Sequence, residues 1–308
     1  MRLNAAIVIL PFLEFFTVWG IRIIQSNDDG WAELYTRCLN DELKAASHHV
    51  LLSAPAHDQS GKEGAASGSL DENPLPLSRP CQYNSCPDER GPYGHNQTRP
   101  DLFWVNSYPV TAMRYGFEQF APRLWSGNSP ELAVAGPNVG SNLGNLRFSG
   151  TAATAAYASL EKRVPAIAFS AASGKRLPWD TSPKPASCKL YAVLATRLVS
   201  KLTEGRKPYL PRDTWLNVNF PAVSDTHCTD PDEFKWVLSR INSKFAARPD
   251  VKICGSERLP DERRVIDTRG CYISISVANS KDKATASREK QKEVVKKLDR
   301  FLSCLPVT

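Results

Sequence analysis

Several common catalytic motifs are absent from this 308-residue chain. It has no Gly-x-Ser-x-Gly, which excludes the nucleophile elbow of α/β-hydrolases. It has neither Gly-x-x-x-x-Gly-Lys-Ser/Thr nor His-Glu-x-x-His, which excludes the usual P-loop NTPases and zinc proteases. His57 and Asp58 stand beside Ser60, but side chains so close together on one loop seldom form a catalytic relay, so a serine triad is disfavoured. The five histidines have no metal-ligand spacing, and we assign them no role.

A block of one charge sign is also missing. Lys and Arg number 39 against 32 Asp and Glu, a formal net charge of +7, but the cations are scattered. The densest run, residues 281–297, carries Asp282, Glu289 and Glu293 among its cations, which is typical of a solvated helix face. We therefore expect no nucleic-acid polymer as a partner.

No stable membrane span is expected either. The one long apolar stretch, residues 5–18, follows Arg2 and is too short and too early to cross a bilayer. It fits a secretory signal peptide over residues 1–20, with cleavage just before Ile21. Glu14 weakens such a signal, so an N-terminal extension or a misassigned start is the alternative.

The eight cysteines favour an oxidising compartment. Their number is even, no Cys-x-x-Cys metal pattern occurs, and Cys81 and Cys86 flank a loop that follows a Pro-rich stretch. Eight cysteines allow 105 pairings, so their connectivity cannot be predicted from the sequence. The sequon that begins at Asn96 is consistent with a glycoprotein. We therefore expect a protein that is secreted or resides in the secretory pathway or vacuole.

The hydrophobic periodicity predicts an α/β fold. A strand at 21–24, a helix at 33–46 and a strand at 50–54 form a βαβ unit, which requires a parallel sheet. Residues 61–101 then run without periodicity, as a long excursion from the core. Further helices are predicted at 109–120, 151–161, 187–202 and 285–302, and further strands at 131–135, 165–170, 214–220 and 272–277.

These elements predict two parts of the mature chain. Residues 21–220 form an α/β catalytic domain, in which helices cover both faces of a mostly parallel sheet. Residues 221–308 form a mixed C-terminal appendage that packs on the core. No internal repeat is evident.

Two adjacent carboxylates mark the end of the first predicted strand. The apolar run that starts at Ile21 stops at Asp28, Asp29 and Gly30, which places both carboxylates in the crevice where open α/β sheets bind ligands. Adjacent carboxylates repel each other and rarely sit together without a cation. Taken alone, Asp-Asp-Gly is also a common turn.

Two further oxygen donors follow other predicted strands. Ser60 comes after the second strand and Asn138 after the strand at 131–135, and these loops emerge at the same edge of a parallel sheet as Asp28 and Asp29. The four side chains predict a site for a hard divalent cation, Mg²⁺ or Mn²⁺. Such a metal would polarise a phosphoryl oxygen, while Asp28 would position or deprotonate the attacking water. Ser60 and Asn138 could also be ordinary turn residues.

A phosphate cradle is predicted nearby. Asn142, Ser149 and Thr151 offer side-chain donors, and Gly150 offers an exposed N–H at the start of a helix. The alternative is that Ser149 and Thr151 are ordinary helix N-terminal residues.

Five blocks of the sequence resemble the SurE family of survival-type phosphatases and nucleotidases, specifically its secreted fungal acid phosphatase branch. They occur in family order over the N-terminal two-thirds of the mature chain. The blocks are residues 26–31, 54–61, 136–144, 148–151 and 165–170.

The resemblance implies a Rossmann-like core and hydrolysis of phosphomonoesters such as nucleoside monophosphates. It also implies that Asp28, Asp29, Ser60 and Asn138 ligate the metal, with catalysis resting on Asp28 and Asp29. Asn142, Ser149, Gly150 and Thr151 would then contact the phosphate. The oligomeric arm of bacterial members has no match in this sequence, so assembly stays open, with a homodimer as one option. A secreted SurE-like binding protein without significant catalysis is the alternative function.

Overall fold

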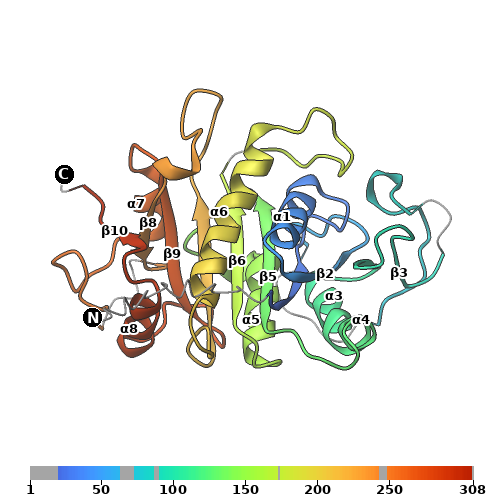
Figure 1. Cartoon of the computed structure of the whole chain (residues 1–308), viewed down its shortest axis with the longest axis horizontal. Helices are drawn as coiled ribbons and strands as arrows, with labels where there is room; N and C mark the ends of the chain where they lie inside the picture. The colour runs from blue at the N-terminus through green and yellow to red at the C-terminus, as the bar shows by residue number, and fades with distance from the viewer. Residues whose placement is uncertain (1–19, 63–72, 87–89, 173, 243–247, 307–308) are drawn as a thin grey trace, which may run out of the picture.

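The strands of the computed structural model form one ten-stranded sheet (Figure 1). Residues 20–62, 73–86, 90–172, 174–242 and 248–306 are described. The order across the sheet is β10-β8-β9-β7-β6-β5-β1-β2-β4-β3. Neighbours are parallel except at the β3/β4 and β7/β9 pairs. The strands are β1 Arg22–Ser26, β2 His49–Pro55, β3 Tyr93–His95, β4 Leu102–Val105, β5 Leu132–Val139, β6 Ala166–Ala171, β7 Thr214–Phe220, β8 Lys235–Ser239, β9 Tyr272–Asn279 and β10 Leu302–Ser303.

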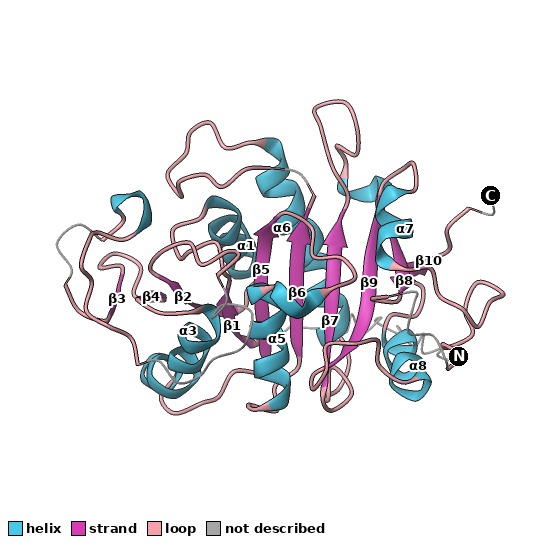
Figure 2. Ribbon diagram, turned by 180° about the vertical axis from the view of Figure 1, so that it is seen from behind, coloured by secondary structure: helices cyan, strands magenta, loops and turns pink. Residues whose placement is uncertain are grey.

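Helices cover both faces of this sheet, as the sequence predicts. Helices α1 and α6 lie on the face toward the viewer in Figure 1, whereas α3 and α5 lie on the opposite face (Figure 2). The α-helices of the described residues are α1 Leu34–Ala45, α3 Pro109–Tyr115, α4 Ala121–Leu124, α5 Gly150–Leu160, α6 Ala186–Thr203, α7 Glu262–Asp267 and α8 Arg288–Lys297.

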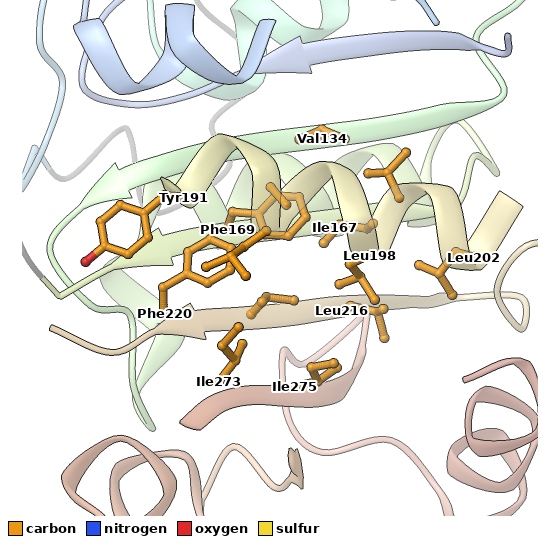
Figure 3. Packing of buried hydrophobic residues seen from close by; sticks show 14 of the residues in the cluster. Val134, Ile167, Phe169, Tyr191, Leu198, Leu202, Leu216, Phe220, Ile273 and Ile275 are labelled. Carbon is orange, nitrogen blue, oxygen red and sulfur yellow. The ribbon is translucent and has the colours of Figure 1, made fainter. Parts of the chain in front are cut away.

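The larger part of the core lies between α6 and the sheet (Figure 3). Leu198 and Leu202 of α6 are buried over the sheet, and the rings of Phe169 and Phe220 stack with centroids 5.7 Å apart. Because side chains alternate along a strand, β6 presents alanines such as Ala168 to the other face, where they meet the alanine-rich α5. The small side chains let α5 lie close to the sheet, and its N-terminus comes near the end of β1.

The βαβ start and most later elements match the sequence prediction to within a few residues. The last helix does not: it was predicted to reach residue 302, but α8 ends at Lys297. Arg300 takes a positive φ of 60°, Phe301 packs on Trp236 with ring centroids 4.8 Å apart, and Leu302 pairs with β8. Tertiary packing therefore ends the helix early. The sequence also gave no signal for β4, β8 or α7.

The sheet continues without a break into the C-terminal part of the chain. β7 pairs with β9, and β9 pairs with β8, so residues 221–308 contribute strands to the same sheet as residues 21–220. The proposed signal peptide, residues 1–20, lies outside the described residues apart from Gly20.

All eight cysteines are paired, which confirms the predicted disulfides. Cys81 pairs with Cys86 within one loop, whereas Cys38 of α1 pairs with Cys188 of α6. The other two bridges lie in the C-terminal part and join Cys228 to Cys271 and Cys254 to Cys304.

Candidate active site

The four predicted metal ligands come from three loops at the carboxyl edge of the sheet. Asp28 and Asp29 follow β1, Ser60 follows β2, and Asn138 lies near the end of β5. The pairing of β5 with β6 shifts register between Ala135 and Asn138, so the strand is irregular directly before Asn138.

Asp28 contacts the start of α5. The hydroxyl of Thr151 donates to Asp28 Oδ1 at 2.8 Å and also lies 3.4 Å from Asn138 Oδ1. Gly150 makes this approach feasible, since a Cβ at that position would stand 2.8 Å from the Asp28 Cβ. The N-terminus of α5 therefore lies directly against the carboxylates that follow β1.

Asp29 accepts hydrogen bonds from three donors, which come from the end of β5 and from the loops after β2 and β6. Ser60 Oγ donates to Asp29 Oδ1 at 3.0 Å, and the N–H of Val139 donates to Oδ2 at 2.8 Å. The guanidinium of Arg176 forms an ion pair with the same carboxylate and lies 3.4 Å from Asp58. Asp29 is thus fully buried but strongly bonded.

Burial raises the pKa of both carboxyls. The pKa of Asp28 rises to about 7, first because the group is desolvated and second because the charge of Asp29 is adjacent. The pKa of Asp29 is also raised by burial, against the opposing effects of Val139 and Arg176. Nearby, burial and then the charge of Asp29 raise the pKa of Glu33 to about 8. A divalent cation would relieve this repulsion, so the buried oxygen donors fit a hard metal ion.

The predicted phosphate residues surround the same point but differ in their engagement. Ser149 caps α5, since its Oγ accepts the N–H of Ala152 at 3.0 Å, so the N-cap role considered from the sequence is present. Asn142 donates through Nδ2 to Ser170 Oγ at 2.8 Å. Thr151 is fully buried and bonded to Asp28.

Arg176 is a site residue that the sequence reasoning missed. Its loop follows β6 and is docked on the segment before α1: the N–H of Leu34 donates to Leu177 O at 3.0 Å, and the N–H of Trp179 donates to Ala32 O at 2.9 Å. The side chain of Arg176 stays 36% exposed, so it faces both Asp29 and the open site. The sequence carries one indication that Arg176 belongs to the site, which is its position after a predicted strand that ends at this edge of the sheet.

A second cluster of potential metal ligands is explained by a disulfide. His227, Cys228 and Cys271 place potential ligand atoms within 4.8 Å of one another, but the two sulfurs form a disulfide. Within the described part of the chain, no helix is both long and apolar enough to cross a membrane.

Known proteins share this architecture and sequence. Residues 23–243 match the family model described as "Survival protein SurE". The chain is 33% identical to an acid phosphatase of Yarrowia lipolytica over 286 residues, which cover 84% of this chain and 79% of that protein. It is 32% identical to the 5'-nucleotidase SurE of Nitrosococcus oceani over 237 residues, 75% of each chain. The crystal structure of a SurE protein from Aquifex aeolicus covers 90% of this chain and 100% of its own with a TM-score of 0.56, and at 19% identity this likeness shows the fold.

Proposed function

This chain belongs to the SurE family, and on that premise we propose that it is a phosphoric monoester hydrolase that works at the Asp28–Asp29 site with a bound divalent cation, Mg²⁺ or Mn²⁺. Its substrates are phosphomonoesters of the acid phosphatase and 5'-nucleotidase type, including nucleoside monophosphates. One observation carries the proposal: Asp28, Asp29, Ser60 and Asn138 converge at one sheet edge, against the N-terminus of α5.

On this proposal the oxygens of Asp28, Asp29, Ser60 and Asn138 would hold the metal. When bound, the cation supplies Lewis-acid polarisation of the phosphoryl group and lowers the pKa of water. These oxygens come from three loops, and Val139, Thr151 and Arg176 fix the two carboxylates by hydrogen bonds. The carboxylates therefore need little reorganisation when substrate arrives.

The residues of the chain divide the remaining work. The water oxygen attacks phosphorus while the ester P–O bond breaks, and Asp28 takes a proton from the water. The departing alkoxide oxygen takes up a proton from solvent and leaves as the alcohol, and Asp28 returns its proton to solvent. The N–H groups at the start of α5 and the side chain of Asn142 bind the phosphate oxygens. Arg176 neutralises charge on the open side of the site.

A chelation experiment tests this proposal. Hydrolysis of p-nitrophenyl phosphate and of a panel of nucleoside monophosphates should fall to background after exhaustive chelation and return when Mg²⁺ or Mn²⁺ is added. Activity that survives complete chelation refutes the metal site. A protein that binds Mn²⁺ and phosphate but hydrolyses no ester in the panel is instead a binding protein on the same fold.

We also propose that the protein is secreted or resides in the secretory pathway or vacuole, because its eight cysteines are all paired. Residues 1–20 would then be removed as a signal peptide. N-terminal sequencing of protein purified from its natural host should give a start near Ile21, and thiol titration of the native protein should detect few free thiols. An intact Met1 together with eight titratable thiols contradicts this localisation.

A further inference from the structure

A buried carboxylate from the C-terminal part of the chain contacts the loop after β5. Glu262 begins the short helix α7 and is 0% exposed. Its Oε2 accepts the N–H of Gly144 at 2.8 Å, and its Oε1 accepts the Nδ2 of Asn217 at 2.7 Å. The bond to Gly144 joins residues that are 118 positions apart in sequence.

The same loop is held on its other side by two asparagines of β7. Asn219 Oδ1 accepts the N–H of Asn142 at 2.8 Å, and the amides of Asn217 and Asn219 both donate to Asn142 O, at 2.9 and 3.0 Å. Both backbone polar groups of Asn142 are therefore bonded to β7. Its side chain, which the proposed mechanism places on the phosphate, starts from a backbone fixed in this way.

The chemistry of these contacts calls for a carboxylate at position 262. Two N–H donors, from Gly144 and Asn217, point at two separate oxygens. The ionised carboxylate, which is the form of Glu262 above pH 7, accepts both without presenting a donor of its own. A glutamine would turn its NH₂ group toward one of these donors. Glu262 also sets the orientation of the Asn217 amide. The carboxylate oxygen can only accept, so the NH₂ group of Asn217 and not its carbonyl oxygen must face Glu262. Burial makes the charged form of Glu262 costly and raises its pKa to about 7.

We propose that Glu262 is a positioning residue: from the C-terminal part of the chain it fixes the loop of residues 140–144, and thereby the Asn142 side chain that binds the phosphate of the substrate. The role in phosphate binding rests on the proposed function. The role in holding the loop rests on the geometry alone. Residues 221–308 thus take part in substrate binding although none of the predicted ligands lies there.

The main test compares Glu262→Gln with Asp250→Asn. Asp250 is a second buried carboxylate of the C-terminal part, paired with Arg240 at 2.7 Å and bonded to Gln291. Losing one charge-assisted hydrogen bond costs about 1.5–3 kcal/mol, a factor of roughly 10–100. Glu262→Gln should therefore raise KM and the inhibition constant of inorganic phosphate about tenfold or more, while kcat and Mn²⁺ affinity change less than about threefold. Asp250→Asn should lower the melting temperature but leave KM and phosphate inhibition unchanged.

Two further measurements keep the inference testable by itself. Amide hydrogen exchange of the peptide that contains residues 139–145 should speed up in Glu262→Gln and not in Asp250→Asn, whether or not the enzyme is active. If Glu262→Gln does not fold, Asn217→Ser should reproduce the rise in KM and the faster exchange. A double-mutant cycle of these two changes should be non-additive.

The outcomes separate this inference from the proposed function. A folded Glu262→Gln protein with wild-type KM, phosphate inhibition and loop exchange overturns the inference and leaves the phosphatase proposal intact. A parallel fall in kcat and Mn²⁺ affinity with unchanged KM also overturns it. A wild-type protein that fails the chelation experiment refutes the proposed function, while faster exchange in Glu262→Gln would still support the role of Glu262 in holding the loop.

Discussion

At the scale of single residues, the two adjacent carboxylates have different surroundings. Asp29 receives a hydroxyl, a backbone N–H and the guanidinium of Arg176, whereas Asp28 receives the hydroxyl of Thr151 and backbone N–H groups. Hydrogen bonds and a cation favour the ionised form of a carboxyl group, and burial disfavours it. Burial raises the pKa of both groups, but the ion pair with Arg176 opposes that rise at Asp29, and the proposed function gives the role of base to Asp28.

Asp28→Asn tests this division of roles. The amide keeps the shape of the side chain but removes a charge and a base, so turnover and metal affinity should fall together. Loss of a general base costs about 10²–10⁴-fold in kcat, and a displaced metal adds to that. Steady-state kinetics and Mn²⁺ titration measure both effects. Asp232→Asn, on a side chain that is 80% exposed, is the control and should leave both unchanged. Wild-type turnover in Asp28→Asn is incompatible with the proposed site.

Arg176 supports a second prediction at this scale. Arg176→Gln removes the cation that contacts Asp29 and Asp58, so kcat/KM should fall about 10–100-fold at saturating Mn²⁺. Arg176→Lys should recover only part of this loss, because an ammonium cannot reproduce the planar fork of a guanidinium. The neighbouring exposed cation offers a matched control, Lys175→Gln, which should keep wild-type kinetics. Equal kinetics for the two glutamine variants would show that Arg176 has no role in turnover.

At the scale of elements, two disulfides flank the site. The short bridge between Cys81 and Cys86 closes a loop that packs on the carboxyl ends of the strands: the N–H of Gln82 donates to Ala56 O at 3.0 Å, and Trp31 Nε1 donates to Ser85 Oγ at 2.9 Å. The long bridge between α1 and α6 spans 150 residues, and the Arg176 loop leads into α6.

The two bridges should differ in how much they stabilise the fold and in whether they affect substrate binding. A closed loop of a few residues restrains the unfolded chain by about 2 kcal/mol, whereas one of 150 residues restrains it by about 5 kcal/mol. Replacing Cys38 and Cys188 with serine should thus cost roughly twice as much unfolding free energy as replacing Cys81 and Cys86. The Cys81/Cys86 variant should instead change relative KM values across a panel of phosphomonoesters. Denaturant unfolding and kinetics measure both, and an unchanged panel would show that this loop does not shape substrate access.

At the scale of the whole molecule, buried carboxyls set how stability depends on pH. The folded pKa of Glu33 is about 8 and that of Glu262 about 7, against an ordinary value of 4.5. Above pH 4.5 these groups ionise in the unfolded chain but stay protonated in the fold, so unfolding releases protons. The metal-free protein should therefore lose stability as pH rises from about 4.5 to about 8.

The melting temperature in chelator checks this prediction. It should be at least about 5 °C higher at pH 5 than at pH 8, because each pKa unit is worth about 1.4 kcal/mol. Glu33→Gln removes one of the groups responsible and should flatten the slope. Glu257→Gln, at a side chain that is 50% exposed, should not. A melting temperature that rises with pH in both the wild type and Glu33→Gln would contradict the raised pKa values of these buried carboxyl groups.

Much of this architecture follows from local sequence patterns. The apolar run that ends at Asp28 and Asp29, and the helical spacing of residues 33–46, predict a βαβ unit because periods of 2 and 3.6 distinguish strand from helix. Parallel strands then bring their carboxyl ends to one edge, so Ser60 and Asn138 were predicted beside the two aspartates and lie there in the structure. The short strand β8 gave no clear signal.

Other features depend on tertiary structure alone. Arg176 meets Asp29 across 147 residues, and Glu262 meets Gly144 across 118, and no local periodicity records which distant segments will meet. The pairing of eight cysteines and the early end of α8 likewise depend on which elements become neighbours in the fold. The sequence by itself determined the order of the elements and the edge where oxygen donors gather, because both follow from backbone geometry. Only the folded chain decided which residues complete the site, because those contacts form between segments that are brought together by packing.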